Sequence, residues 1–179
     1  ESGQGRAARP GGGGVPTNTG ASCPATSGRV SLALGLQGPC VSHDTACSSA
    51  LVANHSSMRA LECDECLTAL SAGINMILHA SGAFATATGG FTSATGRCFT
   101  FDVRADGYAR GEAVDAFACE LGGDDAVSAM TSSAVRQDGR SASLAAPNGV
   151  AQQALISAAL AEARCASDTV ACLEAHGTG

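Results

Sequence analysis

The spacing of apolar and polar positions changes several times along the chain and predicts helices alternating with strands. Over residues 48–63 the apolar positions recur every three or four residues, which is typical of one face of a helix. Residues 148–165 have the same period, and Asn148 is a suitable N-cap for a helix there. A shorter helix is expected within residues 21–36, where Gly35 or the Gly-Pro pair that follows can end it.

Strands are expected where apolar or β-branched stretches lie between turn signals. They fall within residues 40–45, 66–78, 113–121, 126–135 and 169–174. The Gly-Gly-Asp-Asp turn at residues 122–125 is expected to join the third and fourth of these as a hairpin. Residues 79–111 are rich in Gly, Thr and Ser and are predicted to be mainly loop. Strands that alternate with helices indicate an α/β layered fold.

Composition sets the size and packing of the folded part. The chain has 179 residues, of which 45% are hydrophobic and 15% are charged, so most of it is expected to fold as one domain. Residues 1–20 contain a run of four Gly and are predicted to be a flexible leader, which leaves residues 21–179 as the domain. Because 23 residues are Gly and many more are Ala, we expect a core of small side chains with close backbone packing.

Charge excludes two classes of partner. The net charge is −6 and the ten basic residues are all Arg, with no basic cluster, which argues against nucleic acid or an anionic membrane surface. Residues 67–96 contain no charged side chain, but their Thr, Ser, Asn and His residues are too polar for a lipid-facing helix. No membrane span is therefore expected.

The nine cysteines do not form the frame of a disulfide scaffold. Their number is odd and their spacings do not repeat, so we interpret them as reduced thiols in a reducing compartment, either the cytoplasm or the interior of an organelle. Cys63 and Cys66 form a CxxC pair, but no second pair stands at zinc-finger spacing, and no metal site is expected.

Cys47 has the most informative surroundings of the nine. It lies between the expected strand at 40–45 and the expected helix from 48, and its neighbours are small. Amides at a helix N-terminus favour a thiolate over a thiol, and they can also donate to an oxyanion that forms when the thiolate attacks a carbonyl. On this spacing alone, a nucleophile and a small buried cysteine at a helix start both remain open.

The residues around Cys47 carry a family resemblance. Asp44-Thr45-Ala46-Cys47-Ser48-Ser49 resembles the nucleophile motif of the β-ketoacyl synthase (ketosynthase) family of fatty-acid and polyketide synthases. The resemblance extends from about Ala21 to Gly179 and includes further blocks in the family's order: residues 27–31, 97–102, 106–112, 137–141, 146–149 and the Glu-Ala-His-Gly-Thr-Gly block at 174–179.

The resemblance implies a fold and a reaction. The fold would be the thiolase-like layered α-β-α-β-α architecture, incomplete here, with the chain forming the end of its first half. Cys47 would be the nucleophile that accepts an acyl group from the phosphopantetheine of an acyl carrier protein. His176 would donate to the thioester carbonyl of a malonyl-type extender and stabilise the enolate left by loss of CO₂. The domain itself would bind no cofactor and no metal, and the intact parent would be a homodimer.

Several departures and alternatives remain. The family's second active-site His and its Gly-Phe-Gly segment belong beyond Gly179, so the isolated chain is not expected to catalyse condensation. Arg136 and Asp115 depart from the family's preferences and leave the substrate open. A papain-like Cys-His hydrolase, with a similar separation of its two residues, would need a Trp beside the Cys, and the chain has none. A non-catalytic ketosynthase-like fragment, inactive or serving as a scaffold, is the alternative of a different class.

Overall fold

The computed structural model describes residues 22–143 and 146–178. The expected leader at 1–20 lies outside these residues. Backbone contacts divide the chain into two units, Glu1–Asp44 and Thr45–Gly179, and each is described by itself. None of the helices in the described residues is long and apolar enough to cross a membrane.

The first unit contains helix α2, Cys23–Leu34. Gly35 ends it with a left-handed φ of 69°, and the amide of Leu36 reaches back to the Ser31 carbonyl at 2.9 Å. Glycine takes this conformation without a Cβ penalty, so the predicted helix and its end are confirmed.

The expected strand at 40–45 is wrong. The sheet of the described chain contains two strands, and neither includes these residues. Side-chain bonds connect the segment to α2 instead: the hydroxyls of Ser27 and Ser42 lie 2.8 Å apart, and that of Ser31 donates to Cys40 Sγ at 3.4 Å. β-Branched composition indicates a preference for extended backbone, but a strand also needs a neighbour for its ladder.

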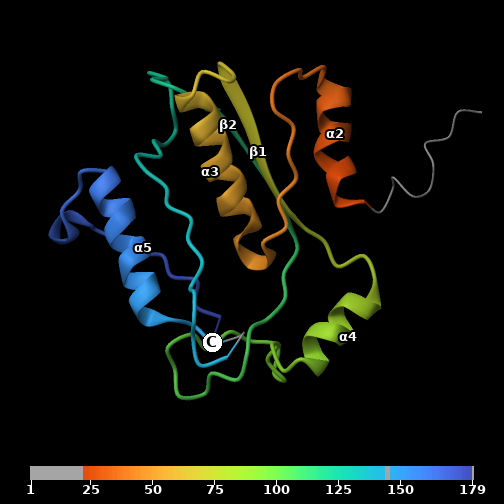
Figure 1. Ribbon diagram of the computed structural model, residues 1–179. Coiled ribbons are helices and arrows are strands. Elements are labelled where there is room, and N and C mark those ends of the chain that lie inside the picture. The colour runs from red at the N-terminus through yellow and green to blue at the C-terminus, as the bar shows by residue number, and fades with distance from the viewer. Residues whose placement is uncertain (1–21, 144–145, 179) are drawn as a thin grey trace, which may run out of the picture. The chain divides into compact units, whose positions relative to one another are not determined.

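The packed part of the second unit is one helix on two strands (Figure 1). Helix α3 (Ser49–Glu62) contacts strand β1 (Thr68–Asn75), which pairs antiparallel with β2 (Ala113–Glu120) over its full length. At their contact, a Cβ on Gly73 would lie 2.9 Å from the Ala50 Cβ, so a side chain there would push the helix away. Small residues thus bring the helix close to the sheet, as the composition predicted.

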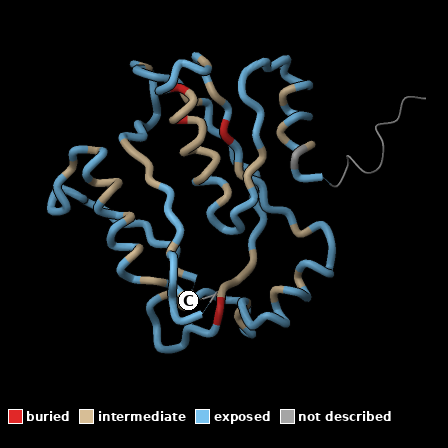
Figure 2. The backbone as a smooth tube through the Cα atoms, in the orientation of Figure 1, coloured by how far each residue is buried: buried red, intermediate tan, exposed pale blue. Residues whose placement is uncertain are grey.

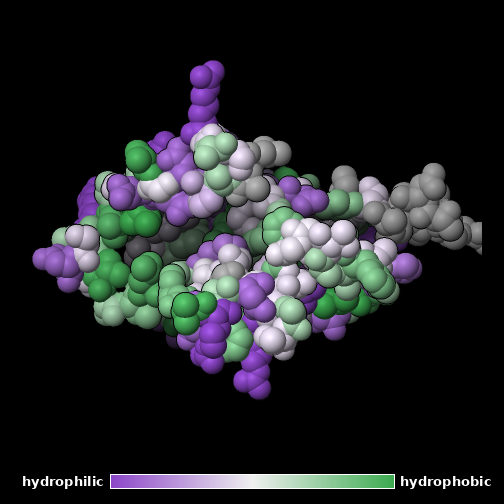
Figure 3. Space-filling view, turned by 90° about the horizontal axis from the view of Figure 1, so that it is seen from below, coloured by the Kyte–Doolittle hydropathy of each residue, from purple (hydrophilic) through white to green (hydrophobic). Residues whose placement is uncertain are grey.

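The core is small. Met58 and Leu61 of α3 are the buried apolar side chains of the described residues, and Ser71 of β1 is the buried polar one (Figure 2). Apolar side chains such as Phe84, Val114 and Val150 remain at the surface, and Figure 3 shows apolar residues spread among polar ones on one face.

Helix α4, Ala80–Thr88, lies in the stretch that was expected to be mainly loop, and that expectation is wrong here. His79 caps it, because its side chain accepts a hydrogen bond from the Ser81 amide at 3.3 Å. Alanine at four of the nine positions favours the helix, whereas the surrounding Gly, Ser and Thr obscured it in the sequence.

The expected hairpin between 113–121 and 126–135 is also wrong. The first segment forms β2, but its partner is β1. The turn at 122–125 does form, with the Ala126 amide donating to the Gly123 carbonyl at 3.3 Å, yet residues 126–135 join no ladder. The expected strand at 169–174 is likewise absent, and a short 3₁₀ turn, η2 (Ser167–Thr169), precedes irregular backbone.

Helix α5, Gly149–Glu162, confirms the prediction for 148–165 together with its cap, since the Asn148 side chain accepts from the amides of Val150 and Ala151. Polar bonds hold it to the packed part. Arg59 of α3 forms an ion pair with Glu162, and the Ser132 hydroxyl donates to the Ala159 carbonyl at 2.9 Å.

Candidate functional site

Cys47 lies on a tight turn that runs directly into a helix. It is the middle residue of the 3₁₀ turn η1 (Ala46–Ser48), and α3 follows without a break. Its side chain is exposed. The expectation that Cys47 lies directly before a helix is therefore confirmed, although no strand leads into the turn.

The residue before Cys47 has a strained backbone. Ala46 has a φ of 55°, in the left-handed region where a residue with a Cβ costs about 1–2 kcal/mol. Such strain persists only where the surroundings hold it, and it concentrates at functional sites. In hydrolases a comparable sharp turn before a helix presents the nucleophile to substrate. The turn at Ala46 has the same consequence, because Cys47 stands exposed immediately before the helix.

Three hydroxyl side chains of the same motif hold this turn. The Ser49 hydroxyl accepts from the Thr45 amide at 2.8 Å and donates to the Ala46 carbonyl at 2.7 Å. The Ser48 hydroxyl lies 2.9 Å from both the carbonyl and the side-chain oxygen of Thr45. We call Thr45, Ser48 and Ser49 the hydroxyl brace. Sequence reasoning assigned these residues no role, although short hydroxyl side chains characteristically bond to nearby backbone.

Cys47 lies close to the N-terminus of helix α3. The positive end of the α3 dipole lies two residues away, and the first turn of α3 contains no acidic residue to oppose it.

His176 lies in a different kind of environment. It is exposed and stands in the irregular backbone after η2. The next residue, Gly177, has a φ of 52° and is partly buried. The Thr100 hydroxyl donates to the Gly177 carbonyl at 2.6 Å, and a Cβ on Gly177 would lie 2.7 Å from the Thr100 methyl carbon. Among the described residues no hydrogen bond joins Cys47 to His176, and their convergence on one substrate stays a prediction.

The block at 106–112 makes structural contacts with the segments before it in the sequence. Gly107 is buried with a φ of 127°, and a Cβ there would come within 2.7 Å of the Ser93 amide nitrogen. This close approach lets Tyr108 pair with Thr92. Arg110 donates to the Thr86 hydroxyl of α4 at 3.1 Å.

The next residues of this block reach the end of β1. The Glu112 carboxylate accepts from the Ile77 amide, and the Asn75 side chain donates to the Gly111 carbonyl. The hydrogen bonds of Arg110 and Glu112 thus give both charged residues a structural role, and no catalytic role is needed to account for them.

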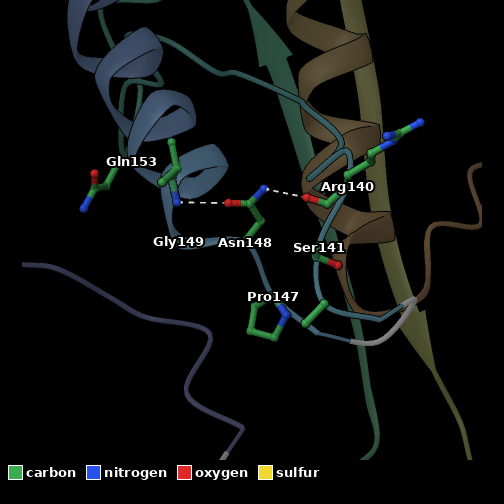
Figure 4. Close-up of a pocket in the computed structure, with 8 residues that line it drawn as sticks. Arg140, Ser141, Pro147, Asn148, Gly149 and Gln153 are labelled. Carbon is green, nitrogen blue, oxygen red and sulfur yellow. Dashed lines mark hydrogen bonds between the residues drawn. The ribbon is translucent and has the colours of Figure 1, made fainter.

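Hydrogen bonds of Asn148 connect the blocks at 137–141 and 146–149 (Figure 4). The Asn148 amide group donates to the carbonyls of Asp138 and Arg140 at 3.0 and 3.2 Å. An open hollow of about 580 Å³ lies beside it, and neither Cys47 nor His176 lines it. Sequence reasoning recognised Asn148 as a helix cap but not as the residue that ties both blocks together.

All nine cysteines are unpaired. The described residues contain no group of three or more His, Cys, Asp or Glu side chains arranged to hold a metal ion.

Two family models match the chain. Residues 4–118 match the β-ketoacyl synthase N-terminal domain, and residues 127–179 match the β-ketoacyl synthase C-terminal domain. The chain belongs to the β-ketoacyl synthase family. Cys47 falls in the first match and His176 in the second, and the turn at 122–125 lies between the two.

Polyketide synthases are among the curated relatives. The chain is 42% identical over 160 residues to a phenolphthiocerol/phthiocerol polyketide synthase of Mycobacterium tuberculosis, with 86% of this chain and 10% of the relative covered. It is 44% identical over 166 residues to a type I polyketide synthase of phenolphthiocerol synthesis from Mycobacterium bovis, with 89% and 8% covered. The chain thus spans about a tenth of these relatives' length.

Solved structures agree on the fold. The chain matches the oxazolomycin ketosynthase domain OzmH KS7 of Streptomyces albus with a TM-score of 0.85 at 35% identity, covering 88% of this chain and 29% of that one. It matches the module 6 ketosynthase of the bacillaene synthase of Bacillus subtilis with a TM-score of 0.81 at 28% identity, covering 89% and 30%. The fold is therefore thiolase-like, and the chain spans less than a third of these domains.

Proposed function

We propose that this chain is part of a condensing ketosynthase domain in which Cys47 carries the acyl group and His176 assists the condensation. The observation that supports this most strongly is the turn at Cys47. An exposed sulfur follows a strained left-handed alanine, precedes a helix N-terminus and stands in the family's nucleophile block.

The first step is transfer of the acyl group. The Cys47 thiolate attacks the carbonyl of an acyl thioester on a carrier protein, the bond to the carrier's sulfur breaks, the carrier's thiolate leaves, and an acyl-Cys47 thioester remains. The oxyanion of this step would need a backbone amide donor beside the sulfur. The small neighbours of Cys47 leave room for the carrier's phosphopantetheine arm.

The second step forms the carbon–carbon bond. A malonyl-type thioester loses CO₂, and His176 donates a hydrogen bond to its thioester oxygen, where the enolate charge develops. The enolate carbon attacks the acyl-Cys47 carbonyl, a β-ketoacyl thioester forms on the carrier, and the Cys47 thiolate is released. His176 therefore acts on the extender, and Cys47 acts on the starter.

The partners in this proposal are an acyl carrier protein and its acyl and malonyl-type thioesters. Similarity to polyketide synthases supports a polyketide pathway rather than a particular acyl chain. A homodimer of the complete domain and a reducing compartment, which keeps the Cys47 thiol available, belong to the same proposal.

Acyl loading of the complete ketosynthase domain tests it. The domain is incubated with an acyl thioester, and the modified peptide is located by mass spectrometry. We expect the acyl group on Cys47 and at least about a thousandfold slower loading in Cys47→Ala. Cys63→Ala, which removes an exposed thiol at the other end of α3, should load normally. Loading that survives Cys47→Ala would overturn the assignment of Cys47, whereas no loading of the unsubstituted domain would favour the non-catalytic alternative.

A further inference from the structure

A contact between two distant segments holds the backbone beside His176. Thr100 and Gly177 are separated by 77 positions, yet the Thr100 side chain touches Gly177 at two points. Its hydroxyl donates to the Gly177 carbonyl at 2.6 Å, and its methyl group occupies the space that a Cβ on residue 177 would need. Both residues are partly buried, so the contact is partly shielded from water.

The loop that carries Thr100 is itself well held. Phe101 has a left-handed φ of 64°, and the Asp102 amide closes the turn on the Phe99 carbonyl at 2.9 Å. The Asp102 carboxylate accepts from the Arg104 side chain at 2.9 Å through two of its nitrogens, and the guanidinium lies 4.4 Å from the centre of the Phe99 ring. These contacts hold the conformation of the loop on which Thr100 lies.

His176 has no comparable support of its own. It is exposed, and the residues from 170 to 178 form neither helix nor strand. The direction of its ring depends on the backbone at residues 176 and 177. The Thr100 hydroxyl holds that backbone through its hydrogen bond to the Gly177 carbonyl. The left-handed Gly177 is the residue through which the contact acts.

We infer that Thr100 is a positioning residue for His176: it fixes the Gly177 carbonyl and thereby aims the imidazole at the extender thioester. This inference rests on the proposed function, since aiming matters only if His176 acts on the extender. Thr100 touches no reacting atom, so its removal should slow condensation and leave acyl loading of Cys47 unchanged.

Two substitutions separate the hydroxyl from the methyl group. Thr100→Val keeps the shape and removes the donor, and Thr100→Ser keeps the donor and removes the methyl. Thr95→Val is the matched control, because the Thr95 hydroxyl lies 3.0 Å from that of Ser93, two residues away in its own turn. Each variant is made in the complete ketosynthase domain, and its thermal midpoint is recorded to confirm that it folds.

Condensation and loading are then measured with the same acyl and malonyl thioesters, and the His176 ring is observed by NMR of ¹³C-labelled histidine. We expect Thr100→Val to slow condensation about tenfold, with loading within twofold, because small displacements of a catalytic group are costly. Its His176 signal should shift, whereas Thr100→Ser and Thr95→Val should stay close to the parent domain.

Two outcomes would overturn the inference. Either condensation and the His176 signal are unchanged in Thr100→Val, or loading falls as much as condensation. His176→Ala distinguishes this failure from failure of the proposed function. If that variant condenses normally, His176 has no role and the proposed function is wrong, whereas a loss in His176→Ala without one in Thr100→Val rejects only the positioning role.

Discussion

The turns at Cys47 and at His176 are built in opposite ways. The Cys47 turn is local: its bonds come from Thr45, Ser48 and Ser49, and a long helix follows directly. The His176 turn has no regular element around it and is held by Thr100, far away in the sequence. The turn of the proposed nucleophile is therefore held by its own motif, whereas the turn of the proposed second residue depends on a distant partner.

A large contrast is expected at two left-handed glycines. Gly177 and Gly139 have φ values of 52° and 67°, but a Cβ at Gly177 would strike Thr100, and at Gly139 it would meet nothing within 4 Å. Alanine strains the backbone at both positions. Gly177→Ala should slow condensation about tenfold, because the backbone beside His176 must move.

Gly139→Ala is the control for this comparison. It carries the same backbone strain without the collision, so condensation should change by less than about twofold. Steady-state condensation rates of the two variants, with acyl loading measured in parallel, check the difference. Equal losses in both variants would mean that left-handed strain alone, and not the contact with Thr100, matters at Gly177.

A smaller effect is expected from the hydroxyl brace. Ser49→Ala removes the acceptor for the Thr45 amide and the donor to the Ala46 carbonyl. The turn then loses two bonds that hold Cys47 at the helix end, so the rate of Cys47 alkylation by limiting iodoacetamide at pH 7 should fall severalfold, about threefold or more. Ser57→Ala, the same change in the middle of α3, should leave the rate unaltered. An unchanged rate in Ser49→Ala would show that the brace does not position the sulfur.

The contrast between local and distant contacts also decides which parts of the fold and site could be predicted from the sequence. The position of Cys47 at a helix start, and the helices before and after it in the sequence, were predictable, since apolar periodicity, Gly35 and the 44–49 block are all local signals. The pairing of β2 with β1, the helix at 80–88 and the contact of Thr100 with Gly177 were not. Each depends on a partner more than 30 positions away or on a cap hidden in a Gly- and Ser-rich stretch.

The backbone strain at Ala46 leads to a stability prediction of about 1 kcal/mol. Ala46→Gly relieves the left-handed conformation, and the relief of about 1–2 kcal/mol is partly offset by the greater freedom of glycine in the unfolded chain. The free energy of unfolding should rise by up to about 1 kcal/mol. Ala53→Gly, inside α3, should lower it by about 1 kcal/mol. Denaturant titration of both variants measures the two changes, and a loss of stability in Ala46→Gly would contradict the strain.

The smallest effect is expected at acid pH in the loop that carries Thr100. Hydrogen bonds from the Arg104 side chain, and then from its backbone amide, lower the pKa of Asp102. A carboxyl group with a lowered pKa stabilises the folded state fully above its ordinary pKa of about 3.9, and this contribution is lost as pH falls through the lower, folded-state pKa. Asp102→Asn should therefore flatten the acid limb of the stability curve and leave its slope near pH 7 unaltered. If the stability of the parent protein and of Asp102→Asn fell equally steeply at acid pH, other carboxylates would be responsible for the loss of stability.

The separate roles of the two turns are tested most directly by His176→Ala in the complete domain, with acyl loading and condensation timed in the same sample by mass spectrometry. We expect that Cys47 still acquires its acyl group within about twofold of the normal rate, while condensation falls by about a hundredfold or more because the enolate has lost its donor. Equal loss of loading and condensation would contradict it, because His176 would then be activating the Cys47 thiol rather than acting on the extender.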